Sequence, residues 1–142
     1  MPKVSESIDI KATAKDCYAV IWDYAKYPEF VSGVNAIKVK KKKKDQIDVE
    51  FSVSLVKDVV YWVSVHGQPH ESVTWSLLEG SAFKKIEGSW ELLESKKGLV
   101  TATYTLDLEF NIYVPGPILK TMIASTLSPM LKSFKKRIES QK

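Results

Sequence analysis

The chain has 142 residues, of which 44% are hydrophobic and 27% charged, and its formal net charge is +4. These values are ordinary for a globular protein, so they exclude a mainly disordered chain and predict a single domain over residues 1–142. The single cysteine, Cys17, excludes an internal disulfide. No run of about eighteen apolar residues occurs, and residues 1–7 lack the apolar core of a signal peptide. We therefore expect a cytoplasmic protein without a transmembrane helix.

The N-terminal part of the chain predicts a strand followed by two helical segments. Residues 3–11 contain alternating polar and apolar side chains, which favours an edge strand. Thr13 is a suitable N-cap, and the apolar residues after it follow helical spacing, so a helix is predicted over residues 14–24. Pro28 interrupts this pattern, and residues 26–31 are predicted to form a short turn or a second helix.

The middle of the chain predicts a series of strands joined by hairpin-length turns, which implies an antiparallel sheet. The predicted strands cover residues 34–39, 47–55, 59–66, 71–78, 82–93 and 100–110. Gly88 lies inside one of them and suggests a bulge or a sharp bend. Continuous apolar stretches leave open which face of strands 59–66 and 82–93 points inward.

A long amphipathic helix is predicted after residues 115–117, Pro-Gly-Pro. Pro117 suits the first turn of a helix, and apolar residues then recur every three or four positions over about 25 residues. Pro129 lies inside this helix and is expected to kink it or divide it in two. Because a sheet of this size must curl or be covered, the long helix is expected to cover it.

This order of elements resembles the helix-grip fold of the START-like (SRPBCC) superfamily. Residues 23–30, Asp-Tyr-Ala-Lys-Tyr-Pro-Glu-Phe, resemble the Asp-x-x-x-Tyr-Pro-x-Phe signature of its polyketide cyclase/dehydrase and coenzyme Q-binding group. Residues 75–77 (Trp-Ser-Leu), Gly80 and residues 88–92 (Gly-Ser-Trp-Glu-Leu) resemble its central hairpin. The resemblance implies an α+β fold in which a curved antiparallel sheet of six or seven strands wraps around the C-terminal helix, with two short helices after the first strand.

The same resemblance implies a cavity between the sheet and the helix that binds an apolar small molecule, such as a lipid, a quinone or a polyketide-like compound, as a carrier or a sensor. No cofactor is expected, because the glycines stand apart and form no phosphate-binding loop. Aromatic and methionine side chains on the strands and the final helix are typical of such a lining, although they also suit a filled core. The expected ligand-binding residues are Phe30, Phe51, Trp62, Trp75, Trp90, Tyr104, Phe110, Met122, Ile123 and Met130.

A cyclase or dehydratase acting on a polyketide-like substrate in this cavity is the second hypothesis, because some members of the group catalyse such reactions. No catalytic residue is predicted. The histidines, His66 and His70, are separated by glycine and proline and lie in no metal-binding motif, so we expect no metal site. Cys17 is expected to be a small buried hydrophobe. Hydroxyls that could donate to a ligand carbonyl, or merely pack in the core, belong to Tyr61, Tyr104 and Tyr113.

A run of lysines supports a third hypothesis, a module that associates with the ribosome or with a membrane. Such a run on a hairpin tip is usually only solvated, but it can also contact anionic lipid headgroups or RNA phosphates. No contact with DNA is expected. The lysine segment consists of Lys40, Lys41, Lys42, Lys43 and Lys44.

Overall fold

The computed structural model describes residues 3–54 and 58–141. Its elements follow the predicted order of a strand, two helical segments, six strands and a long helix. They are β1 (Lys3–Ile10), α1 (Ala14–Trp22), the 3₁₀ helix η1 (Tyr24–Glu29), β2 (Val34–Lys43), β3 (Gln46–Ser54), β4 (Asp58–Gln68), β5 (Ser72–Glu79), β6 (Phe83–Lys96), β7 (Leu99–Phe110) and α2 (Gly116–Ser140). The α+β helix-grip architecture expected from the sequence is confirmed.

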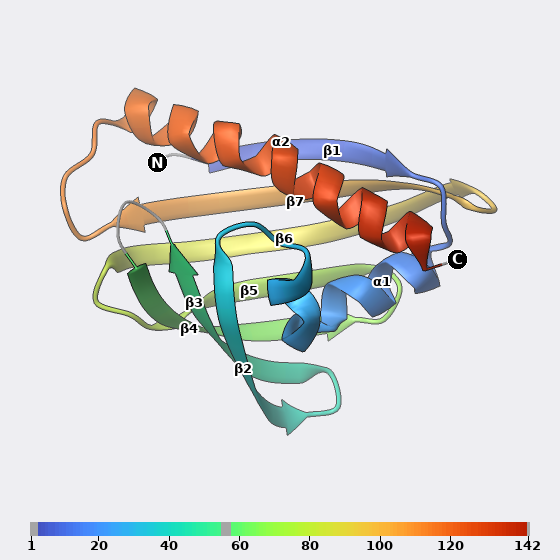
Figure 1. The fold of residues 1–142 in the computed structure, drawn as a ribbon, viewed down its shortest axis with the longest axis horizontal. Coiled ribbons are helices and arrows are strands. Elements are labelled where there is room, and N and C mark those ends of the chain that lie inside the picture. The colour runs from blue at the N-terminus through green and yellow to red at the C-terminus, as the bar shows by residue number, and fades with distance from the viewer. Residues whose placement is uncertain (1–2, 55–57, 142) are drawn as a thin grey trace.

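All seven strands form one antiparallel sheet in the order β1-β7-β6-β5-β4-β3-β2. Consecutive strands from β2 to β7 are neighbours, and β1 closes the order by pairing with β7. Figure 1 shows α2 running across one face of the curved sheet, beside β1 and β7, and ending near α1. Neither α1 nor α2 has both the length and the apolar character that a membrane-crossing helix needs.

Helix α1 begins as predicted at the Thr13 cap, whose hydroxyl accepts a hydrogen bond from the Asp16 backbone N–H at 3.1 Å. The helix packs against β4 at Gly67. A Cβ atom at this position would contact the Tyr18 hydroxyl and the Trp22 ring. The absence of a side chain at Gly67 therefore permits the close approach of α1 to the sheet.

Helix α2 is not divided at Pro129 and runs as one helix from Gly116 to Ser140. A proline inside a helix removes one backbone hydrogen bond. Buried side chains on both sides of Pro129, including Leu127 and Leu131, hold the two halves against the sheet. This tertiary packing offsets the local cost of the proline.

The two halves of α2 are packed in different hydrophobic clusters. Leu131, Phe134 and Ile138 in the C-terminal half belong to the main core, which includes α1, η1 and most of the sheet. Leu119 and Ile123 in the N-terminal half belong to a smaller cluster over the end of β7. The C-terminal half is therefore anchored in the core, whereas the N-terminal half contacts mainly one strand.

The structure also settles the inward-facing phase that the sequence left open. In β4 the side chains of Tyr61 and Val63 face the helix, and in β6 Ile86 and Trp90 do. The bulge considered at Gly88 is wrong, because the register shifts in β6 fall near its two ends and the pairing at Gly88 is regular.

Gly88 instead accommodates Trp75, its partner on the neighbouring strand. The indole ring of Trp75 lies so close to Gly88 that an added Cβ would collide with it. A side chain at this position would displace the indole from the floor of the sheet.

We expect Gly67→Ala to lower the free energy of unfolding by about 1–3 kcal/mol, because the new methyl group displaces Tyr18 and Trp22. Urea unfolding followed by circular dichroism measures the change. Gly116→Ala is the matched control, because no heavy atom lies within 4 Å of its added Cβ; its effect should stay within about 0.5 kcal/mol. Equal stability of both variants would contradict the close packing of α1 on β4.

Candidate functional site

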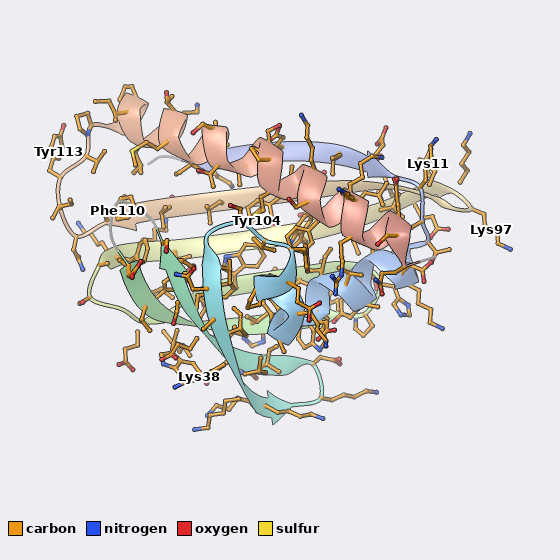
Figure 2. The ribbon with its side chains drawn as sticks, in the orientation of Figure 1. Lys11, Lys38, Lys97, Tyr104, Phe110 and Tyr113 are labelled. Atoms are coloured by element: carbon orange, nitrogen blue, oxygen red, sulfur yellow. The ribbon has the colours of Figure 1, made fainter. Side chains whose placement is uncertain are left out.

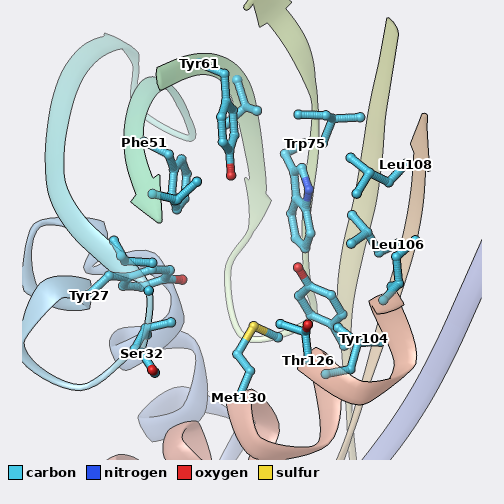
Figure 3. A pocket seen from close by; sticks show the side chains of 18 of the residues that line it. Tyr27, Ser32, Phe51, Tyr61, Trp75, Tyr104, Leu106, Leu108, Thr126 and Met130 are labelled. Carbon is cyan, nitrogen blue, oxygen red and sulfur yellow. The ribbon is translucent and has the colours of Figure 1, made fainter. Parts of the chain in front are cut away.

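A cavity of about 480 Å³ lies between the concave face of the sheet and α2. Its wall is formed by η1, by the segment that follows it, by strands β2 to β7 and by α2. Figure 3 shows side chains from these elements converging on one space. This volume is within the range of roughly 300–1,000 Å³ that is usual for small-molecule sites.

Aromatic rings form a nearly continuous belt around the cavity, and each ring packs against the next. Centroid separations along the belt include 5.0 Å for Trp90 and Tyr104, and 5.2 Å for Tyr27 and Phe134. Such separations are favourable for stacked and edge-to-face pairs. The belt passes through Tyr104, Trp90, Phe134, Tyr27, Tyr24, Phe51, Tyr61, Phe83 and Phe110. These contacts stiffen the wall, so the cavity has a defined shape.

Two phenolic hydroxyls are directed into the cavity, those of Tyr61 and Tyr104 (Figure 3). Burial raises the pKa of both hydroxyls above the ordinary value for tyrosine. Both therefore stay protonated at neutral pH and can donate a hydrogen bond. The Tyr27 hydroxyl has a structural role instead, because it donates to the Ile21 carbonyl at 2.6 Å.

The described residues that line the cavity have only neutral side chains, with no Asp, Glu, His, Lys or Arg among them. An ionised group placed inside would lose its hydration without gaining a partner of opposite charge, which is costly. The lining therefore suits a molecule that is apolar over most of its surface and carries one or two polar atoms.

The lining residues that are also exposed mark where the cavity meets the solvent. On one side they lie in and beside the segment between η1 and β2, and on the other side on α2. They are Ser32, Gly33, Ser54, Met122, Thr126 and Pro129. Gly33 has a φ of 88°, a backbone conformation that other residues adopt only with strain. The turn that forms one rim of the mouth thus depends on this glycine.

Eight of the ten residues predicted as ligand-binding line the cavity. They are Phe51, Trp75, Trp90, Tyr104, Phe110, Met122, Ile123 and Met130. Met122 is 41% exposed and lies at the rim, whereas Trp90 is almost fully buried. These eight side chains therefore lie where the prediction put them, around one cavity. That they bind a ligand stays a prediction.

The other two predicted residues lie outside the cavity. Trp62 lies on the opposite face of β4, where it faces Glu50 and Glu79 on the neighbouring strands. The continuous apolar run over residues 59–63 had left unclear which residues of this strand face inward. Phe30 packs against Phe134 at 5.0 Å, and the Arg137 guanidinium lies 5.0 Å from the centre of its ring.

Several lining residues were not among those predicted from the sequence. Tyr61 and Phe83 follow from the strand alternation once its phase is known, and Phe134 lies one helical turn after Met130. Ser32 and Gly33 carry no signal in the sequence, because the position of their segment depends on how η1 packs.

The other chemical candidates lie away from the cavity. His66 is exposed near the end of β4, His70 is exposed in the β4–β5 turn, and Tyr113 is 89% exposed in the segment before α2. Within residues 3–54 and 58–141 no cluster of three or more His, Cys, Asp or Glu side chains could hold a metal ion. Cys17 is fully buried in the core.

The lysine segment, expected on a hairpin tip, is mostly part of β2, which continues to Lys43. This strand is an edge of the sheet, and lysines on an edge strand hinder pairing with another chain. Two lysines of β2 face acids on β3: Lys38 lies 3.8 Å from Glu50, and Lys42 lies 3.6 Å from Asp48. A contact of the segment with anionic membrane or RNA remains a prediction.

Comparison with known proteins places this fold and cavity in a family. Residues 10–135 match the family model described as polyketide cyclase / dehydrase and lipid transport. The chain belongs to this family. The match covers α1, η1, the sheet from β2 to β7 and most of α2, so it includes every element that lines the cavity.

Solved structures of other proteins share the fold. A START superfamily protein from Mycobacterium smegmatis superposes with a TM-score of 0.89 at 20% identity, covering 99% of both chains. The ZhuI aromatase/cyclase from Streptomyces sp. R1128 superposes with a TM-score of 0.86 at 12% identity, covering 96% of this chain and 93% of its own. Among curated proteins, the persistence and stress-resistance toxin PasT of Escherichia coli is 24% identical over 112 residues, which are 78% of this chain and 70% of PasT.

We expect the Cys17 thiol to be unreactive in the folded protein. Burial, with a smaller contribution from the negative charge of Asp16, raises its pKa to about 12. A free thiol, with a pKa near ~8.5, is partly ionised at a pH of about 8, whereas Cys17 stays protonated until the pH approaches its raised value. Its reaction with Ellman's reagent at pH ~8 should therefore be slow in buffer and fast in denaturant. Rapid labelling of the native protein would contradict the burial of Cys17.

Proposed function

We propose that this protein binds an apolar small molecule in the cavity, with a lipid, a quinone or a polyketide-like compound as the ligand class, and acts as its carrier or sensor. The observation that carries the proposal is a cavity of about 480 Å³, open to solvent at one mouth, with a neutral, mainly aromatic and aliphatic lining. Membership of the polyketide cyclase/dehydrase and lipid transport family supports it.

Ligand burial supplies the driving force for this binding. Each Å² of apolar surface removed from water contributes roughly 25 cal/mol. A ligand that buries about 300 Å² thus gains about 7.5 kcal/mol, from which the cost of immobilisation is subtracted. The belt of contacting rings reduces that cost, because the wall is already ordered before the ligand enters.

Tyr61 and Tyr104 orient the ligand in this proposal. Their hydroxyls are protonated donors in an otherwise apolar space, so they select a ligand with a carbonyl or a similar acceptor. A cyclase or dehydratase would use the same hydroxyls as proton donors. The described lining offers no carboxylate, imidazole or amine to act as a base beside them, which favours the carrier or sensor.

Native mass spectrometry of the freshly purified protein tests the proposal. The wild type should carry a bound apolar molecule that solvent extraction releases and identifies. Leu106 lines the cavity opposite Gly88, so Leu106→Trp should fill the space and lower the bound fraction by roughly tenfold. Leu93→Trp, at a side chain 68% exposed on the same strand pair, is the matched control and should leave the bound fraction unchanged. Loss in both variants, or in neither, would contradict binding in the cavity.

Removing the two hydroxyls tests how the ligand is oriented. Tyr61→Phe and Tyr104→Phe should each weaken binding of a carbonyl-bearing probe by about 1 kcal/mol, or roughly fivefold, because one hydrogen bond is lost. Binding of a pure hydrocarbon probe of the same size should not change. Titration calorimetry with both probes makes the measurement, and equal effects on the two probes would exclude an orienting role.

A further inference from the structure

The segment before α2 and the first turns of that helix expose an unusual amount of apolar surface. Of the eight large hydrophobic side chains that are exposed among the described residues, four lie between positions 112 and 122. They are Ile112, Tyr113, Ile118 and Met122, with exposed fractions of 74, 89, 55 and 41%. Figure 2 shows Tyr113 projecting from the segment at the end of the molecule, beyond the end of β7. Apolar residues gathered in this way are typical of an interaction surface. We call residues 112–126 the docking face.

The serine and threonine hydroxyls of the docking face are already hydrogen-bonded within the helix. The Thr121 hydroxyl donates to the Pro117 carbonyl at 2.9 Å. The hydroxyls of Ser125 and Thr126 both donate to the Met122 carbonyl, at 2.9 and 3.0 Å. A hydroxyl that donates back to its own helix loses little when water is removed, as in helices surrounded by lipid. The docking face can therefore enter an apolar environment without leaving these donors unpaired.

The charge of this region has one sign. Between Asn111 and Ile138 the sequence contains no acidic residue, and its charged residues are Lys120, Lys132, Lys135, Lys136 and Arg137. Lys120 lies within the docking face and is exposed. Two acids, Asp107 and Glu109, precede Lys120 in the chain, and both lie near Lys85. Glu109 is opposite Lys85 on the neighbouring strand, and the Asp107 carboxylate lies 2.8 Å from the ammonium group of this lysine. An exposed apolar surface with lysines and no acid is complementary to lipid headgroups that carry negative charge.

The docking face is continuous with the wall of the cavity. Met122 and Thr126 are exposed and also line the cavity, and Leu119 and Ile123 form the inner side of the same turns. This part of α2 is packed in the smaller hydrophobic cluster, separate from the main core. An apolar molecule leaving a bilayer below the docking face would reach the cavity by passing one helix.

We propose that residues 112–126 dock this protein on the surface of a lipid bilayer that contains anionic lipids. Ile112, Tyr113 and Ile118 enter the headgroup region, and Lys120 contacts the lipid phosphates. Tyrosine suits this position, because its ring is apolar and its hydroxyl stays at the polar interface. The docking face adjoins the cavity lining proposed to hold the ligand, with which it shares Met122 and Thr126. It differs from the lysine segment on β2.

Vesicle sedimentation tests the proposal. The wild type should sediment with vesicles of phosphatidylcholine containing about 30 mol% phosphatidylglycerol, and the bound fraction should fall with added salt. The double variant Ile112→Asp/Tyr113→Asp should bind at least roughly tenfold more weakly, since two apolar side chains are replaced by acids. Both positions are exposed, so the variant should fold, which circular dichroism checks. The matched control is Leu93→Asp, an exposed apolar residue far along β6, which should bind as the wild type does.

A second pair of variants examines the charge. Lys120→Glu should weaken binding to the anionic vesicles severalfold, whereas Lys97→Glu, in the β6–β7 turn, should not. The proposal is overturned if the wild type does not sediment with these vesicles, or if the docking-face variants bind as well as the controls. It is also overturned if Lys43→Glu/Lys44→Glu abolishes binding while the docking-face variants retain it. Vesicle binding does not require an occupied cavity, so this result and that of native mass spectrometry can fail independently.

Discussion

One long helix has to cover the concave face of a sheet of seven strands, and much of the structure follows from this constraint. A helix about 10 Å wide cannot contact every strand of such a sheet. The C-terminal half of α2 is packed into the main core, and its N-terminal half is packed over β7. The space left over is the cavity. The cavity exists because α2 is narrow compared with the sheet that it covers. Its shape is set by the side chains that point into it.

Aromatic residues keep this space open and define its wall. Rings such as Tyr104, Trp90 and Phe134 contact one another at about 5 Å between centroids, so each is held in place by its neighbours. Glycine supports the arrangement at two points. Gly88 leaves room for the Trp75 indole on the floor of the sheet, and Gly67 leaves room for α1 on β4. The wall of the cavity is therefore closely packed, although no described side chain fills the space inside it. Burial also favours the protonated form of its tyrosine hydroxyls.

The outer surface divides into regions with different physical character. On β2 and β3 basic and acidic side chains face one another across the strands, as in the Lys38–Glu50 pair. The N-terminal half of α2 is different, because it combines exposed apolar side chains, internally bonded hydroxyls and positive charge. Since this half of the helix also forms part of the cavity wall, the cavity and an exposed apolar surface share one element. That arrangement suits a protein that exchanges an apolar molecule with an apolar environment.

The sequence by itself determined the elements and the fold. The alternation in β3 and β7, the Thr13 cap and the three-to-four spacing in α2 are local patterns, so they are legible without the structure. The sequence also supplied most of the cavity residues, since alternation places Phe51, Trp75 and Tyr104 on an inward face. It placed Trp62 on the wrong face, because a continuous apolar run does not show which of its residues point inward.

Only the tertiary structure decided which residues meet. The reason for Gly88 lies on another strand, the turn at Gly33 is positioned by the packing of η1, and α2 continues through Pro129 because buried contacts on both sides hold it. These outcomes depend on contacts between residues distant in sequence. Such contacts, and the volume left unfilled among them, exist only when the chain is folded.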